Sequence, residues 1–234
     1  MKPILKINKL QKKFVLHNQN GAILDVLRGF SLEINEGEIV ALCGPSGVGK
    51  STLLKAIYGT YRVDGGSIQC FYDDQWLDIT CAAPREILSL RNSMIGYVSQ
   101  FLRVIPRVPA LDIVAEPAIE LGESEDSARR KAAALLDRLR IPEELFALSP
   151  LTFSGGEQQR VNIARALSAP RKLTLFDEPT ASLDPDNRRT VLDMIVQLRN
   201  AGNAIVGIFH DANDRKILGT RDIDISVQDG GSHA

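Results

Sequence analysis

The chain has 234 residues, of which 44% are hydrophobic and 24% charged, a length and composition that fit one large α/β domain, with or without a helical insertion. Its 28 basic and 29 acidic residues nearly balance, which excludes a broad electrostatic footprint for nucleic acid. With no apolar stretch long enough to span a bilayer, no signal-peptide pattern, and three cysteines (Cys43, Cys70 and Cys81) that lack metal-ligand spacing, the sequence predicts a cytoplasmic protein with reduced, mostly packing cysteines.

The first 38 residues have the pattern of β-strands. Apolar residues such as Ile4, Ile7 and Ile34 recur between polar ones, and Gly21 and Gly37 stand where turns are expected. This region therefore predicts a β-rich layer that precedes the rest of the domain.

A glycine-rich loop follows and joins an apolar run, residues 39–43, to a predicted helix over residues 52–57. Its glycines let successive backbone N–H groups point at phosphate oxygens, Lys50 can reach the β- and γ-phosphates, and the Ser51 hydroxyl can ligate Mg²⁺. A glycine-rich turn without a ligand is the alternative, and the complete GxxxxGK[ST] pattern in this context disfavours it. The predicted ATP-binding residues here are Gly44, Pro45, Ser46, Gly47, Val48, Gly49, Lys50, Ser51 and Thr52.

Between this loop and residue 168 the pattern changes from strands to helices. A hairpin is expected around Gly65 and Gly66, and a strand over residues 94–99 that ends at Gln100. Residues 101–168 then predict a mainly helical insertion, with Ser124 as an N-cap and Pro142 beyond the helix end. The apolar stripe of that helix consists of Ala128, Ala132, Leu135, Leu136 and Leu139.

A second glycine-rich element opens a helix within this region. Ser154 and Glu157 have the spacing of a capping box, and capping alone would explain the serine at about 1 kcal/mol. However, Gly155 and Gly156 are costly inside a helix start unless something must approach the backbone closely. A γ-phosphate facing this turn would be such a group, so we expect capping and phosphate binding together.

An acidic pair follows the next apolar run, residues 172–176. A central parallel strand there would deliver Asp177 and Glu178 to the carboxyl edge of the sheet, beside the phosphate loop. Asp177 then suits the Mg²⁺ shell, through a water molecule, and Glu178 can polarise the water that attacks the γ-phosphorus. An Asp-Glu pair in an exposed turn is the alternative, which a buried strand leading directly into the pair disfavours.

These motifs, in this order, resemble the motif set of ABC-type ATPase domains over nearly the whole chain. The segments that carry the resemblance are residues 44–51, 153–160, 177–180, 182–184 and 210–211. Two departures are small, because Phe153 stands where leucine is common and Glu157 where glutamine is common, and neither removes a phosphate-binding group.

The resemblance implies an α/β phosphate-loop fold of ABC type: an antiparallel β-layer (1–38), a nucleotide-binding core (39–100 and 169–234) and a helical subdomain (101–168). It also implies that Gln100 senses Mg²⁺ and the attacking water, and that His210 contacts the γ-phosphate. By the same resemblance Phe14 stacks on adenine, although considered alone it would be an ordinary core aromatic. Asp184 lies in the loop that joins the two halves of a dimer.

The working unit implied by this resemblance contains two ABC subunits. Each chain has one set of motifs, and in ABC ATPases the Ser154-type turn binds the phosphate held by the partner subunit. The partner is either a second copy of this chain or a sister subunit. The force would leave through residues 101–109, after Gln100, which would be a docking surface if they are exposed and a packed connector if they are buried.

Within ABC ATPases, the sequence most resembles the L-type ATP-binding subunits of bacterial carbon–phosphorus lyase systems, which implies partners in a soluble lyase complex and a role in phosphonate use. The resemblance lies in residues 14–17, 20–21, 98–107, 152–165 and 204–211. The alternative is the energising subunit of a membrane transporter of the lipoprotein or peptide export type, with a permease as partner. A non-hydrolysing scaffold is disfavoured because Glu178 and His210 are both present.

Overall fold

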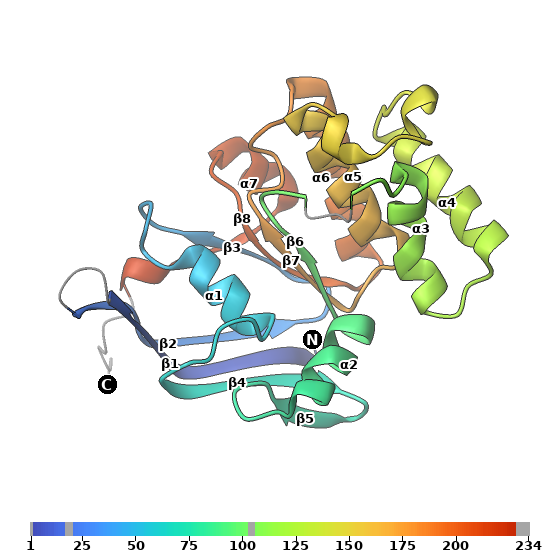
Figure 1. Ribbon diagram of the computed structural model, residues 1–234. Helices are drawn as coiled ribbons and strands as arrows, with labels where there is room; N and C mark the ends of the chain where they lie inside the picture. The colour runs from blue at the N-terminus through green and yellow to red at the C-terminus, as the bar shows by residue number, and fades with distance from the viewer. Residues whose placement is uncertain (1, 17–20, 103–105, 228–234) are drawn as a thin grey trace.

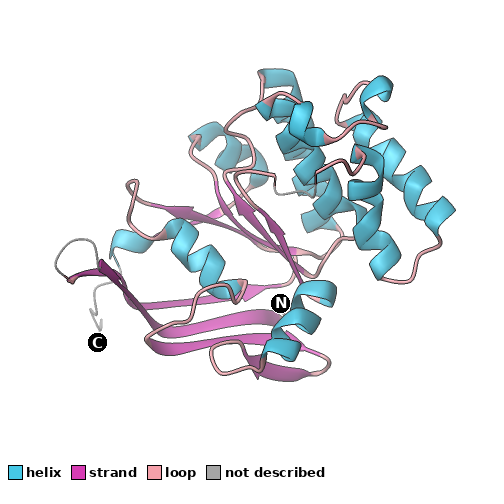
Figure 2. Ribbon diagram, in the orientation of Figure 1, coloured by secondary structure: helices cyan, strands magenta, loops and turns pink. Residues whose placement is uncertain are grey.

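Two β-sheets of different type form the framework of the fold, as Figures 1 and 2 show. The computed structural model describes residues 2–16, 21–102 and 106–227, so residues 17, 20 and 103–105, which carry part of the resemblance, lie outside the described residues. One sheet is antiparallel with the strand order β2-β1-β4-β5, and the other has the order β6-β7-β8-β3-β9. The structure confirms the predicted α/β fold with an antiparallel layer and a parallel core.

The antiparallel sheet is larger than the predicted layer, because it draws strands from beyond residue 38. Its hairpin turn lies at Asp73 and Asp74, whose φ angles of 51° and 59° are typical of a two-residue type I′ turn. The hairpin expected at Gly65 and Gly66 is therefore wrong. A Cβ on Gly66 would lie 2.4 Å from the Lys9 carbonyl oxygen, so this glycine allows β4 to approach its neighbour β1 closely at the register shift between Asn8 and Gln11. The strands are β1 (Pro3–Leu16), β2 (Ala22–Asn35), β4 (Gly65–Tyr72) and β5 (Gln75–Asp78).

The second sheet is parallel at each of its strand pairs within the described residues. Its central strands are short and buried, as expected where helices and a second sheet cover both faces. Every carboxyl end therefore meets at one edge of the sheet. The strands are β3 (Ile39–Cys43), β6 (Ile95–Val98), β7 (Leu173–Asp177), β8 (Ala204–Ile208) and β9 (Arg221–Asp224).

Two apolar clusters hold these layers together. One lies between the sheets and includes the buried face of α1, and the other packs the opposite face of the parallel sheet against α3, α4, α5 and α6. Within the described ranges, every helix is too short or too polar to cross a bilayer. The helices are α1 (Lys50–Ile57), α2 (Pro84–Ser93), α3 (Ala110–Glu120), α4 (Glu125–Arg138), α5 (Gly155–Ser168), α6 (Pro185–Asn200) and α7 (Ala212–Leu218).

Helix α4 forms where its apolar stripe predicts. Ala128, Ala132, Leu136 and Leu139 are fully buried against the neighbouring helices, because residues four apart share one face of the helix. Ser124 does occupy the N-cap position, but its side chain makes no capping hydrogen bond.

The three cysteines are free and differ in exposure: Cys70 is buried, Cys43 is half-buried at the end of β3, and Cys81 is exposed. Burial raises the pKa of the Cys70 thiol to about 12. Cys70 is therefore a packing residue of the antiparallel sheet.

Candidate nucleotide site

Four neighbouring strands of the parallel sheet bring most of the predicted site residues to one edge. In the order β6-β7-β8-β3, they lead to Gln100, to Asp177 and Glu178, to His210, and to the glycine-rich loop. Ligands of open α/β sheets bind at this carboxyl edge, so the topology itself assembles the site.

The glycine-rich loop connects β3 to α1 in the predicted strand–loop–helix order. Gly44 and Gly49 have φ angles of 123° and 111°, and a Cβ on Gly49 would lie 2.6 Å from a Val26 methyl group. The buried Lys50 curls back, and its Nζ donates hydrogen bonds of 2.8 Å to the carbonyl oxygens of Gly44 and Pro45. The ammonium group thus lies inside the loop, where a bound phosphate would meet it.

A pair of oxygen ligands lies between the loop and β7. The Ser51 hydroxyl donates to Asp177 Oδ1 at 2.9 Å, and the Tyr97 hydroxyl donates to Asp177 Oδ2 at the same distance. Asp177 is buried at the end of β7. Tyr97 was not among the predicted site residues, because a tyrosine in a short strand is more often a packing residue. The one feature of the sequence that points to it is its position shortly before Gln100.

Glu178 lies between two other predicted residues. Its Oε1 is 2.8 Å from His210 Nε2, and its Oε2 accepts a hydrogen bond of 3.2 Å from Gln100 Nε2. The φ of Glu178 is 55°, a left-handed backbone conformation that is uncommon for residues other than glycine and often stores strain at functional sites. The three side chains therefore form one polar group facing the loop.

A cavity of about 260 Å³ lies between the glycine-rich loop, Glu178 and His210. The half-buried Phe14 ring lies on its wall, which places this aromatic beside the phosphate loop. Leu24 and Val26 of β2 form an apolar wall that the sequence analysis did not single out. The lining consists of Phe14, Leu24, Val26, Ser46, Gly47, Gly49, Lys50, Ser51, Thr52, Glu178 and His210.

The Ser154 turn lies at the start of α5 and does not line this cavity. The capping box is confirmed: Ser154 Oγ accepts from the Glu157 N–H at 3.3 Å, and Glu157 Oε2 accepts from the Ser154 N–H at 2.8 Å. The Ser154 hydroxyl and N–H lower the pKa of Glu157.

The two glycines of this turn differ in their surroundings. A Cβ on Gly156 would lie 3.0 Å from the Ser182 carbonyl oxygen, so its own chain explains this glycine. A Cβ on Gly155 would meet nothing within 4 Å among the described residues. The absent side chain at Gly155 thus leaves backbone open to approach from outside.

Asp184 is the N-cap of α6 in this structure. Its carboxylate accepts hydrogen bonds from the N–H groups of Asn187 (3.0 Å) and Asp186 (3.1 Å). The Asn187 N–H and side chain lower the pKa of Asp184. Like Ser154, it lies outside the lining of the cavity.

Comparisons with known proteins agree with this geometry. The family model described as ABC transporter matches residues 27–181. The lipoprotein-releasing system ATP-binding protein LolD of Hyphomonas neptunium is 38% identical, over 90% of each chain. The macrolide export ATP-binding/permease protein MacB of Sodalis glossinidius is 34% identical over 94% of this chain, which spans about a third of that longer protein.

Among solved structures, the post-hydrolysis dimer of the ATP-binding cassette MJ0796, bound to ADP and Pi, has a TM-score of 0.85 at 30% identity and covers 94% of both chains. A second dimeric structure of MJ0796, titled a bacterial ABC transporter cassette, has a TM-score of 0.84 at 29% identity. These relatives favour the transporter alternative and do not support the resemblance to carbon–phosphorus lyase subunits. The chain belongs to the ABC transporter family and is an ATPase, which binds ATP and hydrolyses it to ADP and phosphate.

Proposed function

We propose that the cavity holds ATP with its base toward Phe14 and its phosphates on the loop. The apolar wall of Phe14, Leu24 and Val26 suits an adenine ring, and Lys50 with the loop N–H groups suits the phosphate charge. The Lys50 ammonium would exchange its bonds to two loop carbonyls for bonds to phosphate oxygens.

Ser51 and Asp177 would hold Mg²⁺, with the nucleotide and water completing its shell. Their oxygens are already 2.9 Å apart, and Mg²⁺ usually takes one or two carboxylates together with substrate phosphates. The ion would neutralise charge on the transferred phosphoryl group. Tyr97 would orient the Asp177 carboxylate through its hydrogen bond.

Glu178 would accept the proton of the attacking water, with His210 and Gln100 beside it. The contacts of Glu178 to both residues support this arrangement, since a base needs an orienting partner within hydrogen-bond reach. His210 also lines the cavity, where it can contact the γ-phosphate, and Gln100 can sense the water and the metal.

We further propose that the complete site forms only between two ABC subunits, in the simplest case two copies of this chain. The observation that carries this proposal is the exposed Gly155, at which an added Cβ would meet nothing within 4 Å among the residues that the structure describes. Ser154, Gly155, Gly156, Glu157 and Asp184 would then face the nucleotide of the opposite subunit. MJ0796 is dimeric in both of its structures, which supports a working unit of two subunits.

ATP turnover would drive a membrane transporter of the lipoprotein or peptide export type, and this chain would lie at the cytoplasmic side of its permease. LolD and MacB, by their names, serve lipoprotein release and macrolide export, which supports this proposal. The division into residues 1–38, residues 39–100 with 169–234, and residues 101–168 remains our proposal for the subdomains, although β4 and β5 of the second part pair with the β-layer of the first.

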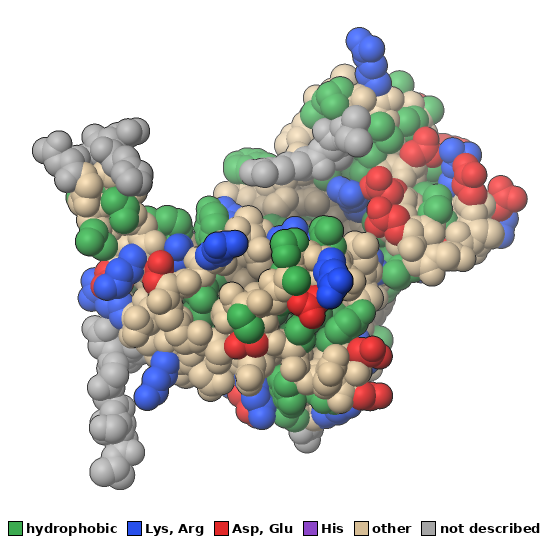
Figure 3. Space-filling model, turned by 60° about the horizontal axis from the view of Figure 1, so that its bottom comes forward, with side chains coloured by type: hydrophobic (Ala, Val, Ile, Leu, Met, Phe, Trp, Pro, Cys, Tyr) green, Lys and Arg blue, Asp and Glu red, His purple; other side chains and the backbone are tan. Residues whose placement is uncertain are grey.

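A groove beside the Gln100 segment is our proposed docking place for the permease. It has a volume of about 380 Å³ and runs between α2, β6, α3 and α5. The face in Figure 3 is hollowed between the helical lobe at the upper right and the rest of the molecule, and acidic and basic side chains are interspersed over it. Phe101, which directly follows Gln100, is 74% exposed, while Leu102 and Val108 pack against the core.

A second candidate is the soluble carbon–phosphorus lyase complex, with a role in phosphonate use. It rests on the sequence resemblance alone, chiefly in residues 98–107 and 204–211. Both candidates share the same ATPase chemistry and differ only in the partner.

Affinity purification of the chain from its native host, with mild detergent and ATP, distinguishes the partners. We expect an integral membrane protein to remain bound, and an alanine at Phe101 to weaken its recovery. Recovery of soluble lyase subunits without a membrane protein would overturn the transporter proposal and favour the second candidate.

A further inference from the structure

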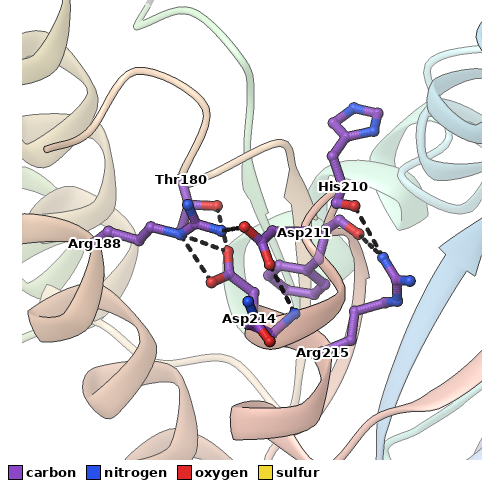
Figure 4. Close-up of polar contacts among 8 residues, drawn as sticks. Thr180, Arg188, His210, Asp211, Asp214 and Arg215 are labelled. Carbon is purple, nitrogen blue, oxygen red and sulfur yellow. Dashed lines mark hydrogen bonds and ion pairs between the residues drawn. The ribbon is translucent and has the colours of Figure 1, made fainter. Parts of the chain in front are cut away.

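A buried carboxylate lies close to the loop that carries Thr180 and to the loop that carries His210 and Asp211 (Figure 4). The side chain of Asp214, in the first turn of α7, is only 3% exposed. It accepts a hydrogen bond of 3.0 Å from the Thr180 hydroxyl and one of 2.8 Å from Arg188 Nε. The same guanidinium forms an ion pair with Asp211 through Nη2.

These four residues connect separate parts of the chain. Thr180 lies two residues after Glu178, Asp211 directly follows His210, and Arg188 lies one turn into α6. Asp211 is also the N-cap of α7, through the Asn213 N–H. One carboxylate and one guanidinium therefore link both loops to helices α6 and α7.

The backbone on the His210 side is held as well. Arg215 Nη1 donates to the carbonyl oxygens of Phe209 at 2.8 Å and His210 at 3.1 Å, and Nε donates to Asp222 at 2.9 Å (Figure 4 shows the two carbonyl contacts). Since both ends of the His210 loop are fixed, the loop has little freedom to move away from Glu178.

The chemistry of this cluster favours a single arrangement. Loss of the charged partner of a buried carboxylate strongly destabilises the folded state, which favours structures in which Asp214 and Arg188 remain paired. Their bonds also shift ionisation: Asp214, with help from Asp211, raises the pKa of Arg188, and the Arg188 side chain lowers the pKa of Asp211. A rigid, charge-assisted cluster of this kind fixes the geometry of whatever is attached to it.

We infer that Arg188 and Asp214 are positioning residues for ATP hydrolysis, because they fix the Thr180 and Asp211 loops that hold Glu178 and His210 in contact. This inference rests on the proposed roles of Glu178 and His210. Neither Arg188 nor Asp214 lines the nucleotide cavity, so they act on the reaction only through these loops.

The test compares Arg188→Met with Arg189→Met. Arg189 is the next residue on α6, its side chain is 68% exposed, and it forms an ion pair with the exposed Asp193, so it is a matched control. We expect Arg188→Met to lower kcat by about 10- to 100-fold with the KM for ATP within about twofold, since misplacement of a catalytic group by about 1 Å costs up to this much. Arg189→Met should leave both values unchanged.

A double variant separates positioning from simple stabilisation. In a His210→Ala background, measured as single turnover with excess protein, Arg188→Met should add less than about a twofold loss, since residues acting as one unit are not additive. A full additional loss, or a wild-type kcat in Arg188→Met, would overturn the inference. If Arg188→Met does not fold, Thr180→Val removes one bond to Asp214 and takes its place in both measurements.

The turnover of the His210→Ala variant alone separates a failure of the proposed role of His210 from a failure of the positioning inference. Wild-type turnover in that variant would contradict the proposed role of His210. A strong loss of turnover in His210→Ala combined with a fully active Arg188→Met variant would overturn the positioning inference and leave the proposed function intact.

Discussion

The phosphate-loop side and the Ser154 side of this chain differ in how far they are complete. On the first side, the site residues converge from adjacent strands of the parallel sheet. Ser51 contacts Asp177 and Glu178 contacts His210, and one cavity is lined by Lys50, Ser51, Glu178 and His210. On the second side, Ser154 and Glu157 form the two reciprocal hydrogen bonds of a capping box at the start of α5. One chain therefore presents a nearly formed nucleotide pocket and, at a separate place, the turn that we propose binds phosphate, which does not line that pocket.

The difference has a physical origin. The pocket is built at the carboxyl edge of one parallel sheet, where topology places its parts together. The turn lies at the start of α5, which packs among α3 and α4, and it does not line the cavity at that edge. A helix start with free N–H groups is suited to an anion, and under our proposal another subunit brings that anion to the turn.

The largest expected effect is on the pocket side. Replacing Glu178 by Gln removes the proposed base, and we expect kcat to fall by about 10²- to 10⁴-fold, the usual contribution of general acid–base catalysis. ATP binding should persist, since the Lys50 loop is untouched. Rapid-quench turnover together with equilibrium binding of labelled ATP checks both expectations. Turnover near the wild-type rate would show that Glu178 is not the base.

The next effect separates the two glycines of the Ser154 turn. Gly155→Ala should leave the unfolding free energy of the monomer unchanged or raise it by up to about 1 kcal/mol, because alanine favours a helix and meets nothing within 4 Å. Its ATPase activity should nevertheless fall, because the methyl group would block the partner's phosphate.

Gly156→Ala is the matched variant, because its Cβ would approach the Ser182 carbonyl oxygen at 3.0 Å. This variant should lose monomer stability as well as activity. Urea unfolding and steady-state turnover are measured on both proteins. If Gly155→Ala kept full activity, the open space at this turn would have no role in phosphate binding.

Much of the pocket could be predicted from the sequence, since its parts are local patterns. The strand–loop–helix around Lys50, the capping box of Ser154 with Glu157, and the strand end at Asp177 each depend on neighbouring residues. Local patterns fix local geometry, and the parallel topology then brings their ends together.

What the sequence could not predict depends on contacts between distant residues. The Tyr97 hydroxyl meets a carboxylate 80 positions away, and Thr180 meets Asp214 34 positions away. The addition of β4 and β5 to the antiparallel sheet likewise depends on tertiary pairing with β1. The role of Gly66 could not be predicted, because a glycine needed for the close approach of two paired strands looks the same in sequence as a glycine in a turn.

The smallest effect concerns the Asp184 cap, which lies outside the pocket lining. Hydrogen bonds from Asn187 depress the pKa of this carboxylate below its usual 3.8, so the charge stabilises the folded state above that value. That stability is lost as the pH falls through the lower pKa of the folded state. Asn is itself a good N-cap, so Asp184→Asn removes the charge and little else.

Thermal unfolding between pH 7 and pH 3 should show Asp184→Asn to be slightly less stable than the wild-type protein. This difference in stability should be constant at higher pH and should become smaller below about pH 4. Asp193→Asn, in an exposed pair on the same helix, controls for the loss of one surface carboxylate. A difference in stability that grew as the pH fell would contradict the lowered pKa of Asp184.

Mixing two inactive variants tests most directly whether the halves of the site come from different chains. Lys50→Ala disables the phosphate loop and Ser154→Arg blocks the turn, so each homodimer should be inactive. In a heterodimer, one site would combine the intact loop of one chain with the intact turn of the other, and an equimolar mixture should recover roughly a quarter of wild-type turnover by random pairing. A mixture as inactive as its components, beside a wild-type protein that turns over ATP as a monomer, would contradict the shared site.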